Sequence, residues 1–202
     1  MKNIVILISG RGSNMEAIIR AAAAEQWPAR IAAVISNRAD AAGLRIAELA
    51  GIPTATIEHR NYADRVSFDR ALAEQIDFFQ PDLVVLAGFM RILSAGFVDH
   101  YRACLLNIHP SLLPSFPGLS THRRALEAGV RYHGATVHFV TQTLDHGPIV
   151  EQAVVPVFAE DTENTLAERV LVEEHRMYPQ AIRAIIEGRI WLEGDHVRRD
   201  AS

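Results

Sequence analysis

The sequence predicts an α/β fold: a doubly wound, mostly parallel Rossmann-like sheet with helices on both faces and an antiparallel C-terminal portion. Strand-like runs rich in β-branched residues alternate with segments whose apolar residues recur at helical spacing, and short loops join them. After residue 130 the alternation stops, and two strand-like runs follow each other across a short link. Repeated βα units favour parallel strands with right-handed crossovers. We expect a single domain over residues 1–202, with an N-terminal half at 1–100 and a C-terminal half at 101–202.

The first half of the chain alternates between strands and helices. Its opening run, NIVILI, is apolar almost throughout, which is typical of a strand buried on both faces. In the third helix Val66, Leu72, Ile76 and Phe79 recur at helical spacing, and Pro81 ends that helix. The expected order is strand 3–8, helix 15–26, strand 31–37, helix 41–51 closed by a glycine, strand 54–59, helix 62–80 and strand 83–88.

The second half begins after a helix that we expect Ser94 to cap, because a serine oxygen can accept from the first amides of a helix. The two strand-like runs that follow Gly129 are expected to be antiparallel neighbours, since their link is short. The expected order is strand 104–109, helix 122–129, strands 135–141 and 149–157, helix 162–188, and a hairpin or edge strand at 189–197.

Composition narrows the class of protein. Hydrophobic residues make up 49% of the chain and charged residues 22%, as in an ordinary globular protein, and the net charge of −4 argues against a nucleic-acid surface. The one cysteine, Cys104, lies among apolar residues and is interpreted as a buried small side chain rather than a catalytic thiol. The chain has no signal-peptide features, and no apolar stretch reaches the roughly 18–20 residues of a membrane helix. We therefore expect a cytoplasmic protein.

Five loops are the candidate ligand sites. In doubly wound sheets, ligands bind outside the carboxyl ends of the strands. The loops that leave those ends read SGRGSN, SNRAD, GFMRILS, NIHPSLLPSFPG and LDHGP.

The loop SGRGSN follows the first strand and opens the first helix, so its amides are expected to form an anion site. A dinucleotide fingerprint needs a third glycine, where this chain has Met15, and an acid after the second strand, where it has Asn37 and Arg38. A nicotinamide-dependent oxidoreductase is therefore a remote alternative. The hydroxyl and the amide of Ser13 and Asn14 suit one phosphate monoester. The other interpretation is a tight turn in which Ser13 only caps the helix.

Asn107 and His109 lie two positions apart on a predicted strand, so both side chains project from the same face. Asp145 follows another predicted strand, which is expected to lie beside the same carboxyl edge of the sheet. An asparagine amide can donate to a developing oxyanion, a histidine can move protons near neutral pH, and an aspartate can orient it and favour its charged form. No G-x-S-x-G motif accompanies them, and Ser111 has no histidine placed as its base. Asn107, His109 and Asp145 together therefore indicate acyl transfer without a protein nucleophile.

Two other functions fit parts of this pattern. A metal site could use His109, His138 and Asp145, with or without His122, although none of the familiar zinc spacings occurs. A non-catalytic sensor that binds a nucleotide would explain the loops but not the complete polar set.

The segments ISGRGSN, AGFMRILS, NIHPSLLPSFPG and LDHGP occur in the order typical of phosphoribosylglycinamide formyltransferases, folate-dependent enzymes of purine synthesis. The chain resembles that family from its first strand to the segment VEEHRMYPQAI. The resemblance implies the formyltransferase fold and transfer of the formyl group of 10-formyltetrahydrofolate, the co-substrate, to the amine of glycinamide ribonucleotide. It implies no metal, no nucleic-acid or membrane partner, and a monomer or homodimer. It also implies ribonucleotide phosphate binding in the first half, and catalysis and folate binding in the second.

The resemblance assigns roles to individual residues. Asn107 and His109 act on the formyl oxygen, with His109 as proton donor, and Asp145 supports His109 and helps to handle the amine proton, directly or through water. The alternative for Glu174 is an ordinary solvated helix residue. The implied ribonucleotide-binding residues are Gly12, Ser13, Asn14 and Glu174, and the implied folate-binding residues are Arg65, Met90, Arg91, Ile92, Leu93 and Asn107.

Several positions differ from the family or vary within it. Leu171 is apolar where the family often has a polar residue, and Arg11 and His146 have no assigned role. Methionyl-tRNA formyltransferases carry an additional C-terminal domain and formyltetrahydrofolate hydrolases an N-terminal one, for which we expect no room here. A hydrolase or another formyltransferase of this fold is the alternative. The Leu113–Pro114 bond is predicted to be cis, because such bonds recur in constrained loops.

Overall fold

The computed structural model describes residues 1–200, and the chain divides into two compact units. The first unit spans Met1–Leu106 and the second begins at Asn107. The division falls inside one strand, β5 (Leu105–His109). The glycine loop therefore belongs to the first unit, and the polar set around His109 belongs to the second.

The first unit is built on parallel strands. Its elements are β1 (Lys2–Ile8), α1 (Ser13–Ala24), β2 (Ala29–Ser36), α2 (Ala42–Leu49), β3 (Thr54–Thr56), the 3-10 helix η1 (His59–Asn61), α3 (Arg65–Asp77), β4 (Leu83–Leu86) and α4 (Ala95–His100). The strand order is β3-β2-β1-β4, and the pairs β1–β2, β1–β4 and β2–β3 are all parallel. The order reverses between β1 and β4, and such a switch point is where doubly wound sheets bind ligands.

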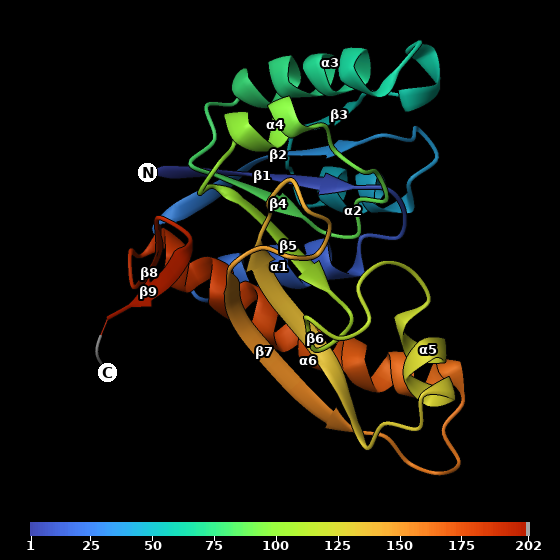
Figure 1. Cartoon of the computed structure of the whole chain (residues 1–202). Helices are drawn as coiled ribbons and strands as arrows, with labels where there is room; N and C mark the ends of the chain where they lie inside the picture. The colour runs from blue at the N-terminus through green and yellow to red at the C-terminus, as the bar shows by residue number, and fades with distance from the viewer. Residues whose placement is uncertain (201–202) are drawn as a thin grey trace. The chain divides into compact units, whose positions relative to one another are not determined.

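Helices cover both faces of these strands, as predicted. Figure 1 shows α3 and α4 on one face and α1 and α2 on the other. Between these layers, the β1 residues from Ile4 to Ile8 have no exposed surface, which explains their continuous apolar sequence.

The second unit combines an antiparallel strand pair with a long helix. Its elements are the end of β5, then α5 (Thr121–Glu127), β6 (Tyr132–Phe139), β7 (Ile149–Pro156), α6 (Glu163–Ile186), β8 (Ile190–Glu193) and β9 (His196–Arg199). β6 and β7 are antiparallel, as predicted, and α6 packs against both, as Figure 1 shows. β8 and β9 form their own two-stranded sheet, so the hairpin prediction is confirmed and the edge-strand alternative is wrong.

Local details correct some predictions. The N-cap of α1 is Gly12, with a φ of 73°, and Ser13 is the first helical residue, so Ser13 does not cap the helix. The side chain of Val66 is 57% exposed and does not belong to the apolar face of α3, because the helix begins at Arg65 and buries Phe68 instead. The helix ends at Asp77, before Pro81.

Other predictions hold. Ser94 caps α4 by accepting from the amide of Phe97, and the Leu113–Pro114 bond is cis. The prediction of a buried Cys104 is wrong, because the residue is half-buried; this partial burial raises the pKa of the thiol. Within residues 1–200, no helix combines the length and the apolar character that crossing a membrane requires.

Candidate active site

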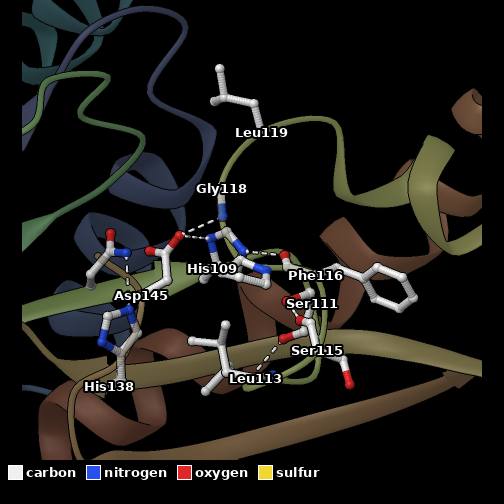
Figure 2. Close-up of polar contacts among 12 residues, drawn as sticks. His109, Ser111, Leu113, Ser115, Phe116, Gly118, Leu119, His138 and Asp145 are labelled. Carbon is white, nitrogen blue, oxygen red and sulfur yellow. Dashed lines mark hydrogen bonds and ion pairs between the residues drawn. The ribbon is translucent and has the colours of Figure 1, made fainter. Parts of the chain in front are cut away.

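Asn107 and His109 lie on β5, in which every residue is buried except the half-buried Asn107. His109 is 7% exposed, and both of its ring nitrogens face oxygen atoms. Its Nε2 lies 3.0 Å from the carbonyl oxygen of Phe116, and its Nδ1 lies 3.5 Å from Oδ2 of Asp145 (Figure 2). The shorter contact fixes the ring, because a carbonyl oxygen accepts only from a protonated nitrogen. The contact of Nδ1 is longer, and its partner is the negatively charged carboxylate of Asp145.

Asp145 reaches His109 from the loop after β6. Its φ of 52° is rare for a residue with a side chain and costs on the order of 1–3 kcal/mol. Its Oδ2 accepts from the amide of Gly118 at 2.8 Å, so the carboxylate joins its own loop to the proline loop (Figure 2). Gly147 allows this turn, since a Cβ there would lie 1.7 Å from the carbonyl oxygen of Phe139. The structure thus brings His109 and Asp145 together, as the sequence predicts.

His138 holds Asn107, and sequence reasoning missed this role. The Nδ1 atom of His138 lies 2.9 Å from the carbonyl oxygen of Phe139, so it carries the proton. Its Nε2 is then an acceptor, and the amide nitrogen of Asn107 donates to it at 3.2 Å. His138 is 2% exposed, and burial lowers the pKa of its ring, which keeps this tautomer neutral. The second amide hydrogen of Asn107 is left to donate elsewhere.

The proline loop after His109 is fixed by hydrogen bonds to β6 and β7. The hydroxyl of Thr136 donates to the carbonyl oxygen of Ser111 at 2.7 Å and accepts from the amide of Leu113 at 3.0 Å. The Nε2 atom of Gln152 donates to the same hydroxyl and to the carbonyl oxygen of Leu113, each at 2.9 Å. The hydroxyl of Ser111 donates to the carbonyl oxygen of Ser115 at 2.6 Å (Figure 2). The hydroxyl of Ser111 is thus engaged in a hydrogen bond within the loop.

Replacing Thr136 with valine is expected to lower the free energy of unfolding by about 2 kcal/mol. The buried amide of Leu113 and the carbonyl of Ser111 both lose their hydrogen-bond partner. An unsatisfied buried polar group costs about 1–3 kcal/mol. Urea denaturation measures this change. Thr136→Ser is the matched control, since it keeps the hydroxyl, and it should retain most of the stability. Equal stability of the valine variant and the parent would contradict the role of this hydroxyl.

Two further histidines lie behind the loop. The ring of His133 packs 5.2 Å from that of His122 and 5.9 Å from that of Phe116, measured between centroids. His133 is 1% exposed, and burial, with a smaller contribution from His122, lowers the pKa of His133 to about 4. Burial also lowers the pKa of His122. The pair is therefore neutral at physiological pH.

The free energy of unfolding is expected to fall as the pH drops from 6.5 toward 4. The pKa of His133 is about 4 in the folded protein and near 6.5 when unfolded, so its neutral form favours folding fully above pH 6.5. At pH 5 the loss from His133 alone is about 2 kcal/mol. Urea denaturation at pH 7.5 and pH 5 of the parent, His133→Gln and the exposed control His146→Gln measures it. The His133 variant should show the smallest loss, and equal losses in all three would contradict the assignment.

The glycine loop opens α1 in the first unit, as predicted. Gly12, Ser13 and Asn14 lie at the N-terminus of α1, whose first amides have no helical acceptor. Gly12 needs its positive φ, and a Cβ there would lie 3.1 Å from the Cα of Gly43 in α2. The close approach of Gly12 to α2 explains why a glycine occupies this position.

The segment Met90–Leu93 has no regular secondary structure, and hydrogen bonds fix the backbone at both of its ends. The amide of Met90 donates to the hydroxyl of Ser9 at 2.7 Å, and the amide of Ser94 donates to Oδ2 of Asp69 at 2.5 Å. Between these anchors, Met90 and Ile92 are 69% and 61% exposed, so the segment presents two apolar side chains to solvent. Arg65 is exposed at the start of α3, in the same unit.

Glu174 lies on α6 and is 7% exposed. The interpretation as an ordinary solvated helix residue is therefore wrong. The neighbouring Leu171 is half-buried. Buried carboxylates are rare unless they have a structural or functional partner.

The metal interpretation does not match the side-chain geometry. Among residues 1–200, no three His, Cys, Asp or Glu side chains lie together as ligands for an ion. The two nitrogens of His138 contact Asn107 and Phe139 instead.

The comparisons with known proteins agree with the fold and with the geometry of the site. Residues 2–182 match the family described as formyl transferase. Over 202 aligned residues the chain is 52% identical to phosphoribosylglycinamide formyltransferase of Escherichia coli (strain K12), covering 96% of this chain and 95% of that protein. The chain belongs to the formyl transferase family.

Solved structures of formyl transferases share the fold. Glycinamide ribonucleotide transformylase 1 from Symbiobacterium toebii has a TM-score of 0.95 and 49% identity, over 98% of this chain and 94% of that one. A formyltetrahydrofolate deformylase from Pseudomonas syringae pv. tomato has a TM-score of 0.90 and 29% identity, over 98% of this chain and 65% of that one. The predicted formyltransferase fold is confirmed.

Proposed function

We propose that this protein transfers the formyl group of 10-formyltetrahydrofolate to the amine of glycinamide ribonucleotide, a step of purine synthesis. The arrangement of Asn107, His109 and Asp145 carries the proposal, because it offers two donors and a carboxylate without a nucleophile. The high identity to phosphoribosylglycinamide formyltransferase over nearly the whole chain supports it.

The reaction needs a site that stabilises a tetrahedral species. The amine attacks the formyl carbon, a carbon–nitrogen bond forms, and the formyl oxygen becomes negative. When the ring of His109 is protonated, its Nδ1 hydrogen and the free amide hydrogen of Asn107 donate to that oxygen, while the contact of Nε2 with Phe116 keeps the ring in place. Asp145 stabilises the positive ring by electrostatic attraction.

Asp145 accepts the proton that the attacking amine must lose. The amine loses a proton to this carboxylate, directly or through water, and the proton passes to N10 of the folate as the bond from N10 to the formyl carbon breaks. The carbonyl then re-forms in the product, and tetrahydrofolate leaves. Each step uses acid–base groups and no covalent enzyme intermediate.

The two substrates are assigned to different residues. The ribonucleotide phosphate binds the amides and hydroxyl of Gly12, Ser13 and Asn14, and Glu174 contacts the ribonucleotide. The folate uses Arg65, Asn107 and the segment Met90, Arg91, Ile92 and Leu93. The protein acts in the cytoplasm as a single formyltransferase domain, as a monomer or homodimer, on these small molecules without nucleic acid or membrane.

Hydrolysis of the formyl-folate is the second candidate, since a deformylase shares the fold. An absorbance assay of folate conversion, with glycinamide ribonucleotide present or omitted, separates the two. Conversion only when the ribonucleotide is present supports the transferase. Equal rates with and without it identify a hydrolase, and no conversion in either case rejects both.

A further inference from the structure

The first unit contains a cavity of about 440 Å³ at its switch point. This volume lies within the range of small-molecule sites, about 300–1,000 Å³. The lining residues come from the loops that leave β1, β2, β3 and β4, so the cavity lies at the carboxyl ends of these strands. The reversal of strand order between β1 and β4 makes this the expected ligand position in a doubly wound sheet.

The cavity has a strong excess of positive charge. Among the described residues that line it, four are arginines and none is acidic: Arg11, Arg38, Arg60 and Arg91. Asp40, outside the lining, binds Arg38 with an N–O distance of 2.7 Å. The Nε atom of Arg91 is buried without a hydrogen-bond partner. Because the protein as a whole has a net charge of −4, this concentration of guanidinium groups is local and indicates an anionic ligand.

The floor of the cavity is held by a polar network. The hydroxyl of Ser9 donates to Oδ1 of Asn37 at 2.6 Å and accepts from the amide of Met90. The Nδ2 atom of Asn37 lies 3.1 Å from Nδ1 of His59. Ser9 and Asn37 are 7% and 3% exposed, so both of these polar lining residues are buried. This network joins the segments that follow four strands, β1, β2, β3 and β4.

We propose that this cavity binds a nucleoside polyphosphate, at a site separate from the Gly12–Asn14 loop. Arginine forks match phosphate oxygens, and several of them together suit a ligand with more than one negative charge. The cavity is larger than a bare phosphate needs. Arg38 follows β2 and Arg60 lies in η1, so guanidinium groups from two different loops reach the cavity. The proposed ligand is not a substrate of formyl transfer, although the cavity shares Met90 and Arg91 with the residues proposed above to bind the folate.

Isothermal titration calorimetry on the full chain tests the site, with ATP, GTP, sodium pyrophosphate and adenosine as probes. Saturating glycinamide ribonucleotide is included in one series. We expect the triphosphates to bind with a Kd below about 1 mM and adenosine not to bind. Binding should persist with the ribonucleotide present and weaken as salt is raised. Pyrophosphate binding as tightly as the triphosphates would assign the site to the phosphate chain alone.

The variant Arg38→Gln/Arg60→Gln should weaken triphosphate binding at least about tenfold, since each charge-assisted contact is lost. Arg45→Gln is the matched control, because Arg45 is an exposed arginine of α2 that does not line the cavity, and it should bind like the parent. Thermal denaturation verifies folding of each variant. The proposal is overturned if no polyphosphate binds below about 10 mM, if the double variant binds like the parent, or if the ribonucleotide displaces the probe completely. None of these outcomes depends on whether formyl transfer is observed.

Discussion

Replacing His109 with alanine is expected to lower kcat by about 10²–10³ when both substrates are saturating, because one preorganised donor to the developing oxyanion is removed. The ring is buried and fixed by the carbonyl of Phe116, so the parent enzyme does not reorganise it during the reaction. The measurement is the steady-state rate of folate conversion. KM values should change much less than kcat, since the contact is proposed to strengthen in the transition state.

The exposed neighbour of Asp145 provides the control. His146→Ala removes an imidazole from the adjacent loop without touching the contacts of His109, and it should keep nearly the parental rate. Near-normal kcat of the His109 variant would show that the histidine is not the proton donor. An equal loss in both variants would indicate disturbance of the loop rather than of the reaction.

Replacing Asp145 with asparagine is expected to lower kcat by about 10² while leaving substrate binding mostly intact. The amide oxygen can still accept from Gly118, so the loop should keep its position. The negative charge that faces Nδ1 of His109 is lost, and so is the acceptor for the amine proton. Steady-state kinetics and direct titration of the ribonucleotide separate the effect on turnover from the effect on binding.

Asp195→Asn makes the same chemical change in an exposed turn between β8 and β9 and should leave kcat unchanged. Unchanged turnover of the Asp145 variant would contradict the pairing with His109. A large loss of ribonucleotide binding would instead indicate that Asp145 contributes mainly to binding.

Sequence periodicity was sufficient to place Asn107 and His109 together, because neighbours at a spacing of two share a face of any strand. The sequence predicted that Asp145 would lie near His109, but it did not predict the geometry of their contact. It depends on the pairing of β6 with β7 and on the positive φ of Asp145, and local sequence does not encode either directly. The close approach at Gly147 is the one local signal of that turn.

The remaining errors have local physical causes. His138 was considered only as a metal ligand, because its role depends on which tautomer the carbonyl of Phe139 selects. Ser13 was a reasonable helix cap by residue type, but the backbone of Gly12 takes that position. Val66 fits the apolar spacing of α3, yet it lies in the first turn and faces solvent. Spacing identifies which residues share a face, and only packing determines which face is covered.

Tracing the formyl carbon tests the central claim most directly. The enzyme is mixed with 10-formyltetrahydrofolate labelled with ¹³C in the formyl group and with glycinamide ribonucleotide, and the products are separated by mass spectrometry. Direct transfer predicts that the label appears on the ribonucleotide amine in an amount equal to the tetrahydrofolate formed. Label recovered as formate, with unlabelled ribonucleotide, would contradict it.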